Sequence, residues 1–195
     1  MWLAIACLFC TLIIGLPAAY GLARHPGWLS RLLEEFISLP LAVPGLALAL
    51  ALLQLYGSMK GFRASWTFIL VGHVLYTLPF MVRSILAVLA AMDLKALEEG
   101  AASLGASPWQ RFRDIVVPNA MPGILAGALT VVTLSIGEFN LTWMLHTPSL
   151  KTLPVGLADS YASMRLEIAS AYTLVFFILI VPLLMAMQWA LSLIH

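Results

Sequence analysis

The sequence predicts an all-α, polytopic transmembrane helical bundle of about five spans, forming one domain over residues 1–195. Of the 195 residues, 62% are hydrophobic and 10% are charged, and the mean hydropathy is +1.00. A soluble domain is about 45–50% apolar and about 25% charged, so this composition excludes an ordinary aqueous fold. The sequence also contains five uncharged stretches of roughly the 20 residues that a helix needs to cross a bilayer.

The predicted spans are residues 1–23, 36–59, 64–82, 115–137 and 168–194. We expect the fourth to continue past Glu138 through Leu141 and Trp143, because the residues after that glutamate are again apolar. The first stretch has no Lys or Arg before its apolar run, so it is expected to remain in the protein rather than to be cleaved as a signal peptide.

Five spans place the two termini on opposite sides of the membrane, and the basic residues indicate which side is cytoplasmic. One side would carry six of them: Arg24, Arg31, Arg83, Lys95, Arg111 and Arg113. The other would carry four: Lys60, Arg63, Lys151 and Arg165. The larger count predicts an outer N-terminus and an inner His195. Arg83 is expected at a helix end, where its long side chain can reach the interface.

The remaining composition excludes several other classes of function. The net charge of +1 argues against a nucleic-acid partner. Cys7 and Cys10 lie three residues apart in an apolar run without a second pair, so they are expected to pack as small hydrophobic residues, with no metal site and no cofactor. No phosphate-binding loop motif and no hydrolase motif occurs, so the chain is not expected to be an enzyme.

Several predicted spans contain residues that disrupt helices, namely Pro17, Pro40, Pro44, Gly45, Gly72 and Pro79. Such breaks persist in lipid only where neighbouring helices or water satisfy the freed backbone groups, so these helices should pack together. Gly123 and Gly127 are four residues apart and would allow another helix to approach closely. Ordinary helix packing is the more frequent explanation for all these positions.

The most polar part of the chain connects the third and fourth spans, between residues 83 and 118, and predicts two short helices. Asp93 can cap the first helix, and Gly105 can end it. An apolar stripe follows the cap at helical spacing: Leu94, Leu97, Ala101 and Leu104. The residues expected to point away from that stripe are Lys95, Glu98, Glu99 and Ala102.

The second short helix should begin at Ser107, with Pro108 in its first turn and Gln110 completing a capping box. Pro118 and Pro122 are then expected to stop or kink the chain. The apolar stripe needs a cover, which could be lipid, the protein's own helices or a second protein. Because the opposite face is net negative, anionic lipid is disfavoured and a protein partner is preferred.

The run from Glu98 to Pro118 resembles the cytoplasmic EAA loop of ATP-binding-cassette importer permeases, whose pattern is E-A-A, three residues, G, nine residues and I-x-L-P. The matching residues are Glu99, Ala101, Gly105, Ile115 and Pro118. The sequence departs from the pattern at Gly100 and Val117, where the family has alanine and leucine. Gly100 should loosen the helix by up to about 1 kcal/mol relative to alanine.

This resemblance implies a permease subunit in a bacterial inner membrane, whose coupling loop at about 93–118 docks on a separate ATPase subunit. The implied docking residues are Glu98, Glu99, Gly100, Ala101, Gly105, Ile115 and Pro118. The implied partners are cytoplasmic ATPase subunits, a second identical or related permease chain, an extracytoplasmic solute-binding protein and membrane lipid. Such permeases usually have six or more helices. Either Met1 is an internal methionine of a longer reading frame, or the family's first helix is absent.

Three residues are candidates for the solute pathway: Glu138, Asn140 and His73. Glu138 would line the outer part of the pathway or hold a helix contact, whereas His73, like Tyr76, is more often a packing residue with a hydrogen-bond partner. The loop of residues 146–167 could contact a binding protein or simply connect two spans. The resemblance favours the branch for polyamines, 2-aminoethylphosphonate, thiamine and ferric iron, and within it a polyamine or 2-aminoethylphosphonate. The alternative is a non-transporting scaffold that recruits a partner through the amphipathic loop.

Overall fold

The computed structural model describes residues 1–192, and these residues form helices joined by short connections, with no strand longer than an isolated bridge between Thr147 and Leu150. The all-α prediction is therefore confirmed. The helices are α1 (Trp2–Arg24), α2 (Trp28–Ala42), α3 (Gly45–Tyr56), α4 (Lys60–Arg63), α5 (Trp66–Ala90), α6 (Leu94–Ser103), α7 (Pro108–Arg111), α8 (Val117–Gly137), α9 (Asn140–Leu145), α10 (Leu153–Ala162) and α11 (Leu166–Ser192), with a π-helical turn at Phe112–Val116. The predicted inner position of His195 and the predicted end of the last span lie outside the described residues.

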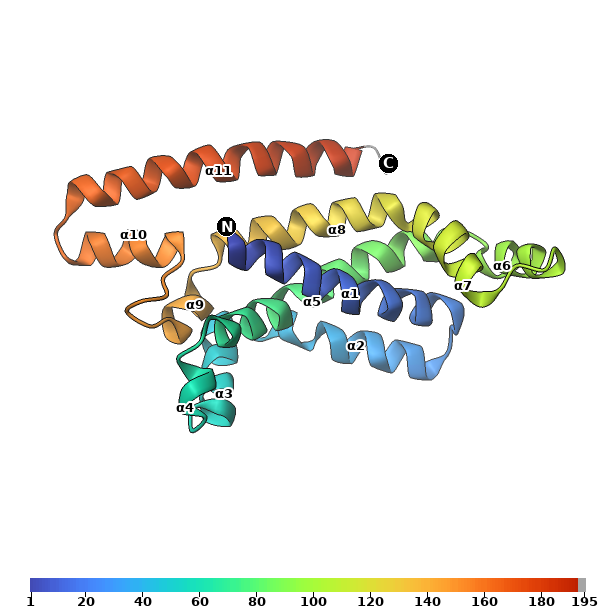
Figure 1. The fold of residues 1–195 in the computed structure, drawn as a ribbon, viewed down its shortest axis with the longest axis horizontal. Coiled ribbons are helices and arrows are strands. Elements are labelled where there is room, and N and C mark those ends of the chain that lie inside the picture. Colours follow the sequence, from blue (N-terminus) through green and yellow to red (C-terminus); the bar gives the residue numbers. More distant parts are fainter. Residues whose placement is uncertain (193–195) are drawn as a thin grey trace.

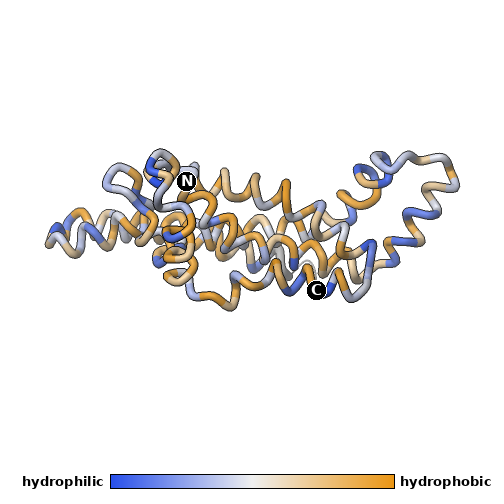
Figure 2. The backbone as a smooth tube through the Cα atoms, turned by 90° about the horizontal axis from the view of Figure 1, so that it is seen from below, coloured by the Kyte–Doolittle hydropathy of each residue, from blue (hydrophilic) through white to orange (hydrophobic). Residues whose placement is uncertain are grey.

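Three long helices form the centre of the bundle: α5 packs against α1 on one side and α8 on another, and α11 runs beside α8 (Figure 1). Helices α3, α4, α9 and α10 gather at one end of the molecule, which we call the α9 end. Helices α6 and α7 project at the other end, the α6 end (Figure 1). Hydrophobic residues dominate the long middle of the bundle, and hydrophilic residues concentrate towards the ends (Figure 2).

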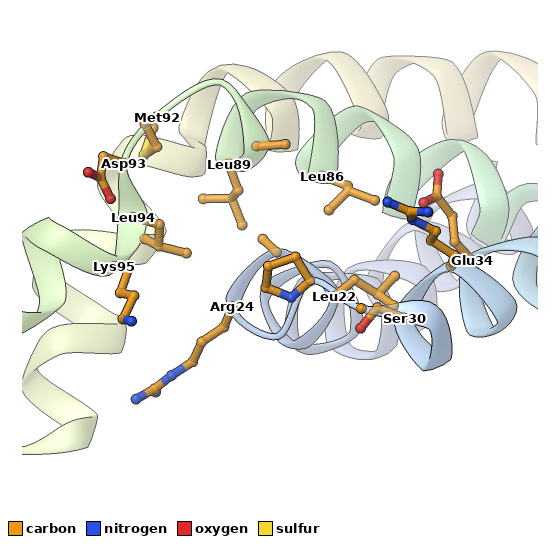
Figure 3. Close-up of a pocket in the computed structure, with 15 residues that line it drawn as sticks. Leu22, Arg24, Ser30, Glu34, Leu86, Leu89, Met92, Asp93, Leu94 and Lys95 are labelled. Atoms are coloured by element: carbon orange, nitrogen blue, oxygen red, sulfur yellow. The ribbon is translucent and has the colours of Figure 1, made fainter.

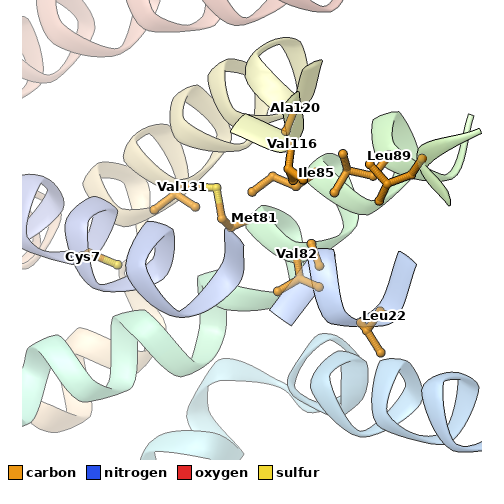
Figure 4. Packing of buried hydrophobic residues seen from close by; sticks show 11 residues of the cluster. Cys7, Leu22, Met81, Val82, Ile85, Leu89, Val116, Ala120 and Val131 are labelled. Carbon is orange, nitrogen blue, oxygen red and sulfur yellow. The ribbon is translucent and has the colours of Figure 1, made fainter. Parts of the chain in front are cut away.

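The main core lies where α1, α5 and α8 meet, and it joins residues far apart in the sequence. Cys7, Met81, Val82, Ile85 and Val131 are all fully buried there (Figure 4). Cys7 thus packs as a small core residue, as expected, and its Sγ lies 3.2 Å from the Thr77 hydroxyl.

The close approach of α5 and α8 depends on the two glycines that the sequence singled out. A Cβ atom at Gly123 would lie 2.6 Å from the Ser84 carbonyl oxygen, and one at Gly127 would lie 2.8 Å from Met81 Sδ. Both distances are too short for a real side chain, so the prediction that a helix packs closely on this pair is confirmed.

Among the described residues, four helices are long and apolar enough to cross a membrane: Trp2–Arg24, Trp66–Ala90, Pro108–Gly137 and Leu166–Trp189. The second predicted span is a bent pair instead, because α2 and α3 meet at an angle of 104°. Val43 precedes Pro44 and is extended, with φ −96° and ψ 125°, and a residue before proline disfavours the helical conformation. The pair makes a fifth span if it is counted as one.

Several predicted helix boundaries are wrong. The second and fourth spans begin earlier than residues 36 and 115, because α2 starts at Trp28 and the helix that includes α8 starts at Pro108. The third span does not stop at Val82, because α5 continues through an exposed Arg83 to Ala90. The fourth does not continue to Trp143, because α8 ends at Gly137 and Glu138 adopts an extended conformation with ψ 121°. Charge was a poor guide to the end of the third span, since an arginine whose side chain is exposed does not interrupt backbone hydrogen bonding.

Three of the basic residues assigned to opposite sides lie at opposite ends of the bundle, as predicted. At the α6 end, Arg24 and Lys95 border the same cavity (Figure 3). At the α9 end, Arg63 donates a hydrogen bond to the Leu145 carbonyl over 2.9 Å.

Candidate functional site: the α6 end and the α9 cavity

The first helix of the polar segment has the ends that the sequence predicted. The Asp93 carboxylate accepts a hydrogen bond from the Ala96 N–H over 3.1 Å, so it caps the N-terminus of α6. At the other end Gly105 has a φ of +85°, and its N–H donates to the Ala102 carbonyl over 2.9 Å. The next N–H, from Ala106, reaches the Ala101 carbonyl over 3.0 Å, which completes a Schellman ending.

The second helix also begins as predicted, but it does not stop at the prolines. Ser107 and Gln110 form a reciprocal capping box, with bonds of 2.7 and 3.3 Å. Helix α7 then continues without a break through the π-helical turn into α8, where Pro118 occupies the first turn and Pro122 lies inside the helix. Of the two expected effects of these prolines, a stop or a kink, the stop is therefore wrong. The Asn119 side-chain amide donates to the Ile115 carbonyl over 2.7 Å, beside the turn.

The predicted apolar stripe of α6 is only partly covered by the chain itself. Leu94 is buried and joins the main core, but Leu97 is 45% exposed and Leu104 is 90% exposed. Trp109 at the start of α7 is 66% exposed. We call Leu97, Leu104 and Trp109 the outer apolar patch. Large apolar side chains that stay exposed outside lipid are candidates for contact with another molecule.

Glu98 does not point outward, contrary to the prediction from the helical pattern. Only 3% of the residue is exposed. Its Oε1 accepts a hydrogen bond from the Tyr20 hydroxyl over 2.5 Å, and its Oε2 lies 3.5 Å from Arg24 Nε. Arg24 Nη1 also donates to the Tyr20 hydroxyl over 2.6 Å. The helical pattern did not predict this burial, because the polar partners of Glu98 lie on α1, far away in the sequence.

The other residues of the predicted docking surface remain accessible. Glu99, Gly100, Gly105 and Pro118 are exposed, and Ala101 and Ile115 are half-buried. Glu99 forms only a surface ion pair with Lys95 at 3.8 Å. Three of the predicted residues come together around one shallow cavity of about 320 Å³ between α6 and α7, namely Ala101, Gly105 and Ile115.

A larger cavity of about 510 Å³ lies between α6 and the ends of α1, α2 and α5. Leu22, Leu86 and Leu89 form its apolar wall, and Arg24 extends from the end of α1 towards the side of α6 (Figure 3). The α6 end therefore carries exposed apolar side chains and is joined to α1 on the side of Glu98.

At the α9 end, Glu138 is not inside a span but at the break between α8 and α9. Its Oε1 accepts from the Leu141 N–H over 2.9 Å. Its Oε2 accepts from the Thr142 N–H over 2.9 Å and from the Thr142 hydroxyl over 3.0 Å. The carboxylate therefore satisfies backbone donors at the start of α9, which explains why an acidic residue is tolerated at this point.

His73 belongs to the same network but is fully buried. Its Nδ1 lies 2.9 Å from the Ser135 hydroxyl, and its Nε2 lies 2.7 Å from the Thr142 hydroxyl. A continuous polar chain thus runs from Glu138 through Thr142 and His73 to Ser135. Sequence reasoning missed the two hydroxyl residues, although hydroxyls inside otherwise apolar helices were an available signal.

Two of the three pathway candidates border one cavity, and the third does not. Glu138 and Asn140 line a cavity of about 330 Å³ together with Tyr76 and Thr133, whereas His73 is enclosed behind it. The buried Thr133 hydroxyl has no hydrogen-bond partner in the part of the chain that the structure describes. We call this space the α9 cavity.

Comparison with known proteins identifies the family. The sequence profile of the family described as "binding-protein-dependent transport system inner membrane component" matches residues 11–194. The chain belongs to this family. As an inner membrane component it resides in the inner membrane, in agreement with its four or five candidate spans.

Curated relatives of this inner membrane component are permease proteins, which are transport components rather than enzymes. A putative 2-aminoethylphosphonate transport system permease protein, PhnV of Salmonella typhimurium, is 28% identical over 91% of this chain and 67% of its own length. The sulfate transport system permease protein CysT of Escherichia coli is 32% identical over 71% of this chain and 56% of its own length. The molybdenum transport system permease protein ModB of Haemophilus influenzae is 31% identical over 71% and 66%, respectively.

The chain spans between about half and two thirds of the length of the curated relatives that it matches. A solved structure of the MetNI methionine ABC transporter in an inward-facing conformation shares the fold, with a TM-score of 0.75 over 100% of this chain and 94% of the matched chain, at 19% identity. The predicted resemblance to importer permeases is confirmed, and the alternative of a non-transporting scaffold finds no support among these relatives.

Proposed function

We propose that this chain is the permease subunit of an ATP-binding-cassette importer, which forms a solute pathway and couples it to a separate ATPase subunit through α6 and α7. The observation that carries the proposal is the outer apolar patch on a rigidly capped projection. A connector between two spans needs neither caps nor exposed leucine and tryptophan, whereas a docking element needs both.

The proposed docking surface combines that patch with the exposed residues of the family motif, Glu99, Gly100 and Gly105. Substitution of Glu99→Lys together with Gly100→Arg, where a Cβ meets nothing within 4 Å, should abolish copurification of the ATPase subunit and ATP-dependent uptake. The matched control is Lys60→Glu with Gly61→Arg, because this pair is exposed at the α9 end and a Cβ at Gly61 meets nothing within 4 Å. Normal copurification and uptake in the first variant would contradict docking through this surface.

The proposed assembly also contains a second permease chain, identical or related, and an extracytoplasmic solute-binding protein. Partners of these kinds are supported by the family, whose transport systems are described as binding-protein-dependent, and by the shared fold with a chain of the MetNI ABC transporter. At the α9 end, the segment of residues 146–167 includes helix α10. The Lys151 ammonium donates a hydrogen bond to the Asp159 carboxylate there over 2.6 Å. This ordered segment is the proposed contact for the binding protein.

For the solute, we propose 2-aminoethylphosphonate rather than a polyamine. The relatives are named for 2-aminoethylphosphonate, sulfate and molybdenum transport, and none of those reported above is named for a polyamine. The carboxylate of Glu138, which lines the α9 cavity, already accepts hydrogen bonds from backbone N–H groups of α9, so it is not free to bind a cationic polyamine.

Proteoliposomes that contain the permease, its ATPase and its binding protein would test this choice. ATP-dependent uptake of 2-aminoethylphosphonate, with no inhibition by spermidine, is the expected result. Uptake of spermidine would overturn the choice of solute while leaving the importer function intact.

A further inference from the structure

We propose that Glu98 is not a docking residue but a positioning residue, which ties the coupling helix α6 to the membrane helix α1 so that movement of α6 is passed on to α1. The inference rests on the proposed function, because a coupling helix has a task only if an ATPase docks on it. It concerns the inner face of α6, which no docking partner can reach.

The first argument is the contrast between two adjacent carboxylates. The side chain of Glu98 is 4% exposed, whereas that of Glu99 is 69% exposed. Consecutive residues on a helix differ by about 100° in direction, so one faces the bundle and the other faces away from it. A partner that binds α6 from outside can therefore contact Glu99 but not Glu98.

The second argument is the chemistry of the partners. A carboxylate withdrawn from water is costly unless charged or strong hydrogen-bond donors compensate it. Glu98 has two such donors, and both come from α1: the Tyr20 hydroxyl at 2.5 Å and the Arg24 guanidinium at 3.5 Å. Because Arg24 also binds the Tyr20 hydroxyl at 2.6 Å, the three groups form a closed triangle rather than a single contact.

The third argument is that this triangle also contacts the π-helical turn that follows α7. The Tyr20 ring packs edge-on against Phe112 with centroids 5.4 Å apart, and Phe112 stacks on Trp109 at 5.8 Å. Trp109 belongs to the outer apolar patch, so the contacts run without interruption from the proposed docking surface to α1. We call Tyr20, Arg24, Glu98 and Phe112 the α1–α6 junction.

The other charged side chains at the start of α6 do not compete with the α1–α6 junction for its partners. Lys95 on α6 forms an ion pair with Glu99, and Asp93 caps the helix. Neither residue therefore competes for Arg24 or for Glu98. The triangle is the only link between α1 and α6 through charged side chains within the described residues. Its loss should thus release α6 from α1 without removing the outer apolar patch.

The experiment compares Glu98→Gln with Glu35→Gln, which changes an exposed carboxylate of α2 outside the docking surface, in the complete transporter reconstituted with its ATPase and binding protein. For Glu98→Gln we expect normal copurification of the ATPase, retained ATP hydrolysis and a several-fold fall in solute transported per ATP hydrolysed. Glu35→Gln should leave the transport-to-hydrolysis ratio unchanged. Tyr20→Phe, which removes one hydroxyl and no charge, should lower the ratio as Glu98→Gln does, and the double variant should be no worse than Glu98→Gln alone.

A second measurement does not depend on transport. In the isolated permease, Glu98→Gln and Tyr20→Phe should each speed hydrogen exchange of the α6 amides by about tenfold, since a lost hydrogen bond to a charged group lowers local stability by that factor or more. Glu99→Gln should leave that exchange unchanged. If the wild type transported nothing, the proposed function would fail while this exchange result could still stand.

The junction proposal is overturned by any of three results: a normal transport-to-hydrolysis ratio in Glu98→Gln, loss of the ATPase from that variant during purification, or equal hydrogen exchange in the Glu98 and Glu99 variants. The second of these would return Glu98 to the docking surface.

Discussion

The Tyr20 hydroxyl donates a hydrogen bond of 2.5 Å to the Glu98 carboxylate, across 78 positions of sequence and between two helices with different roles. Tyr20 lies near the end of a helix long enough to span the membrane, and Glu98 lies on the projecting helix that carries the family motif. The projection is therefore not an independent surface element, because one of its faces belongs to the interior of the bundle.

The packing of α5 against α8 should tolerate no side chain at Gly123. Gly123→Ala places a Cβ against the Ser84 carbonyl. Because a backbone carbonyl cannot rotate away, we expect the free energy of unfolding to fall by about 1–3 kcal/mol. Denaturant titration of the detergent-solubilised protein, followed by tryptophan fluorescence, measures this. Gly21→Ala is the control, since nothing lies within 4 Å of a Cβ there. Equal stability of the two variants would refute the close contact.

Two glycines of the coupling segment should respond to alanine in opposite directions. Gly105→Ala forces a side chain into the left-handed conformation at φ +85° and should destabilise the end of α6 by about 1–2 kcal/mol. Gly100→Ala lies inside α6 in open space and restores the family's alanine, so it should stabilise α6 by up to about 1 kcal/mol. Hydrogen exchange of the α6 amides distinguishes the two, and slower exchange in Gly105→Ala would contradict this account.

His73 should be structural rather than a contact for solute. His73→Leu leaves the buried Ser135 and Thr142 hydroxyls without their shared partner, and this should cost about 1–3 kcal/mol of stability. Thermal unfolding in detergent provides the measurement. Tyr76→Phe is the control from the edge of the α9 cavity, because its hydroxyl forms no hydrogen bond with the described residues. A His73 variant with wild-type stability and altered solute preference would show that this assignment is wrong.

The ion pair at the α9 end should depend on pH in one direction. The hydrogen bond from Lys151, and then its charge, hold the pKa of Asp159 below the ordinary value of 3.8. Because the pKa is lowered in the folded protein, the contact stabilises the segment above that value and is lost as the pH falls through the lowered pKa. NMR titration of the Asp159 carboxyl carbon should give a midpoint below 3.8, and Lys151→Ala should raise it. An unchanged Asp159 midpoint in Lys151→Ala would contradict the assignment. Lys60→Ala is the control and should leave that midpoint unchanged.

The sequence was most informative where structure is determined by neighbouring residues. The caps at Asp93 and Ser107 and the ending at Gly105 each depend on bonds that span a few positions, and all three were predicted correctly. The close glycine pair on α8 was also predicted, because its spacing alone defines a flat helix face.

Features that depend on distant partners were not predicted. The burial of Glu98 requires Tyr20 and Arg24, and a helical wheel contains no information about α1. The bend between α2 and α3 was expected only as a disruption near Pro44, since its angle depends on the helices against which the two halves pack. The end of α8 was missed because the residues after Glu138 are apolar, although its carboxylate can cap a new helix.

The uninterrupted helix from Pro108 to Gly137 has a mechanical consequence. Thirty residues at about 1.5 Å each make a rod of about 45 Å, with Trp109 near one tip and Glu138 directly after the other. The helix contains a π-helical turn at Phe112–Val116, where the spiral is wider and an extra residue is accommodated, and Pro122 lies further along inside it. We expect a displacement of Trp109 by a docked partner to be passed along this helix towards the α9 cavity, with the π-helical turn close to the point where the displacement begins.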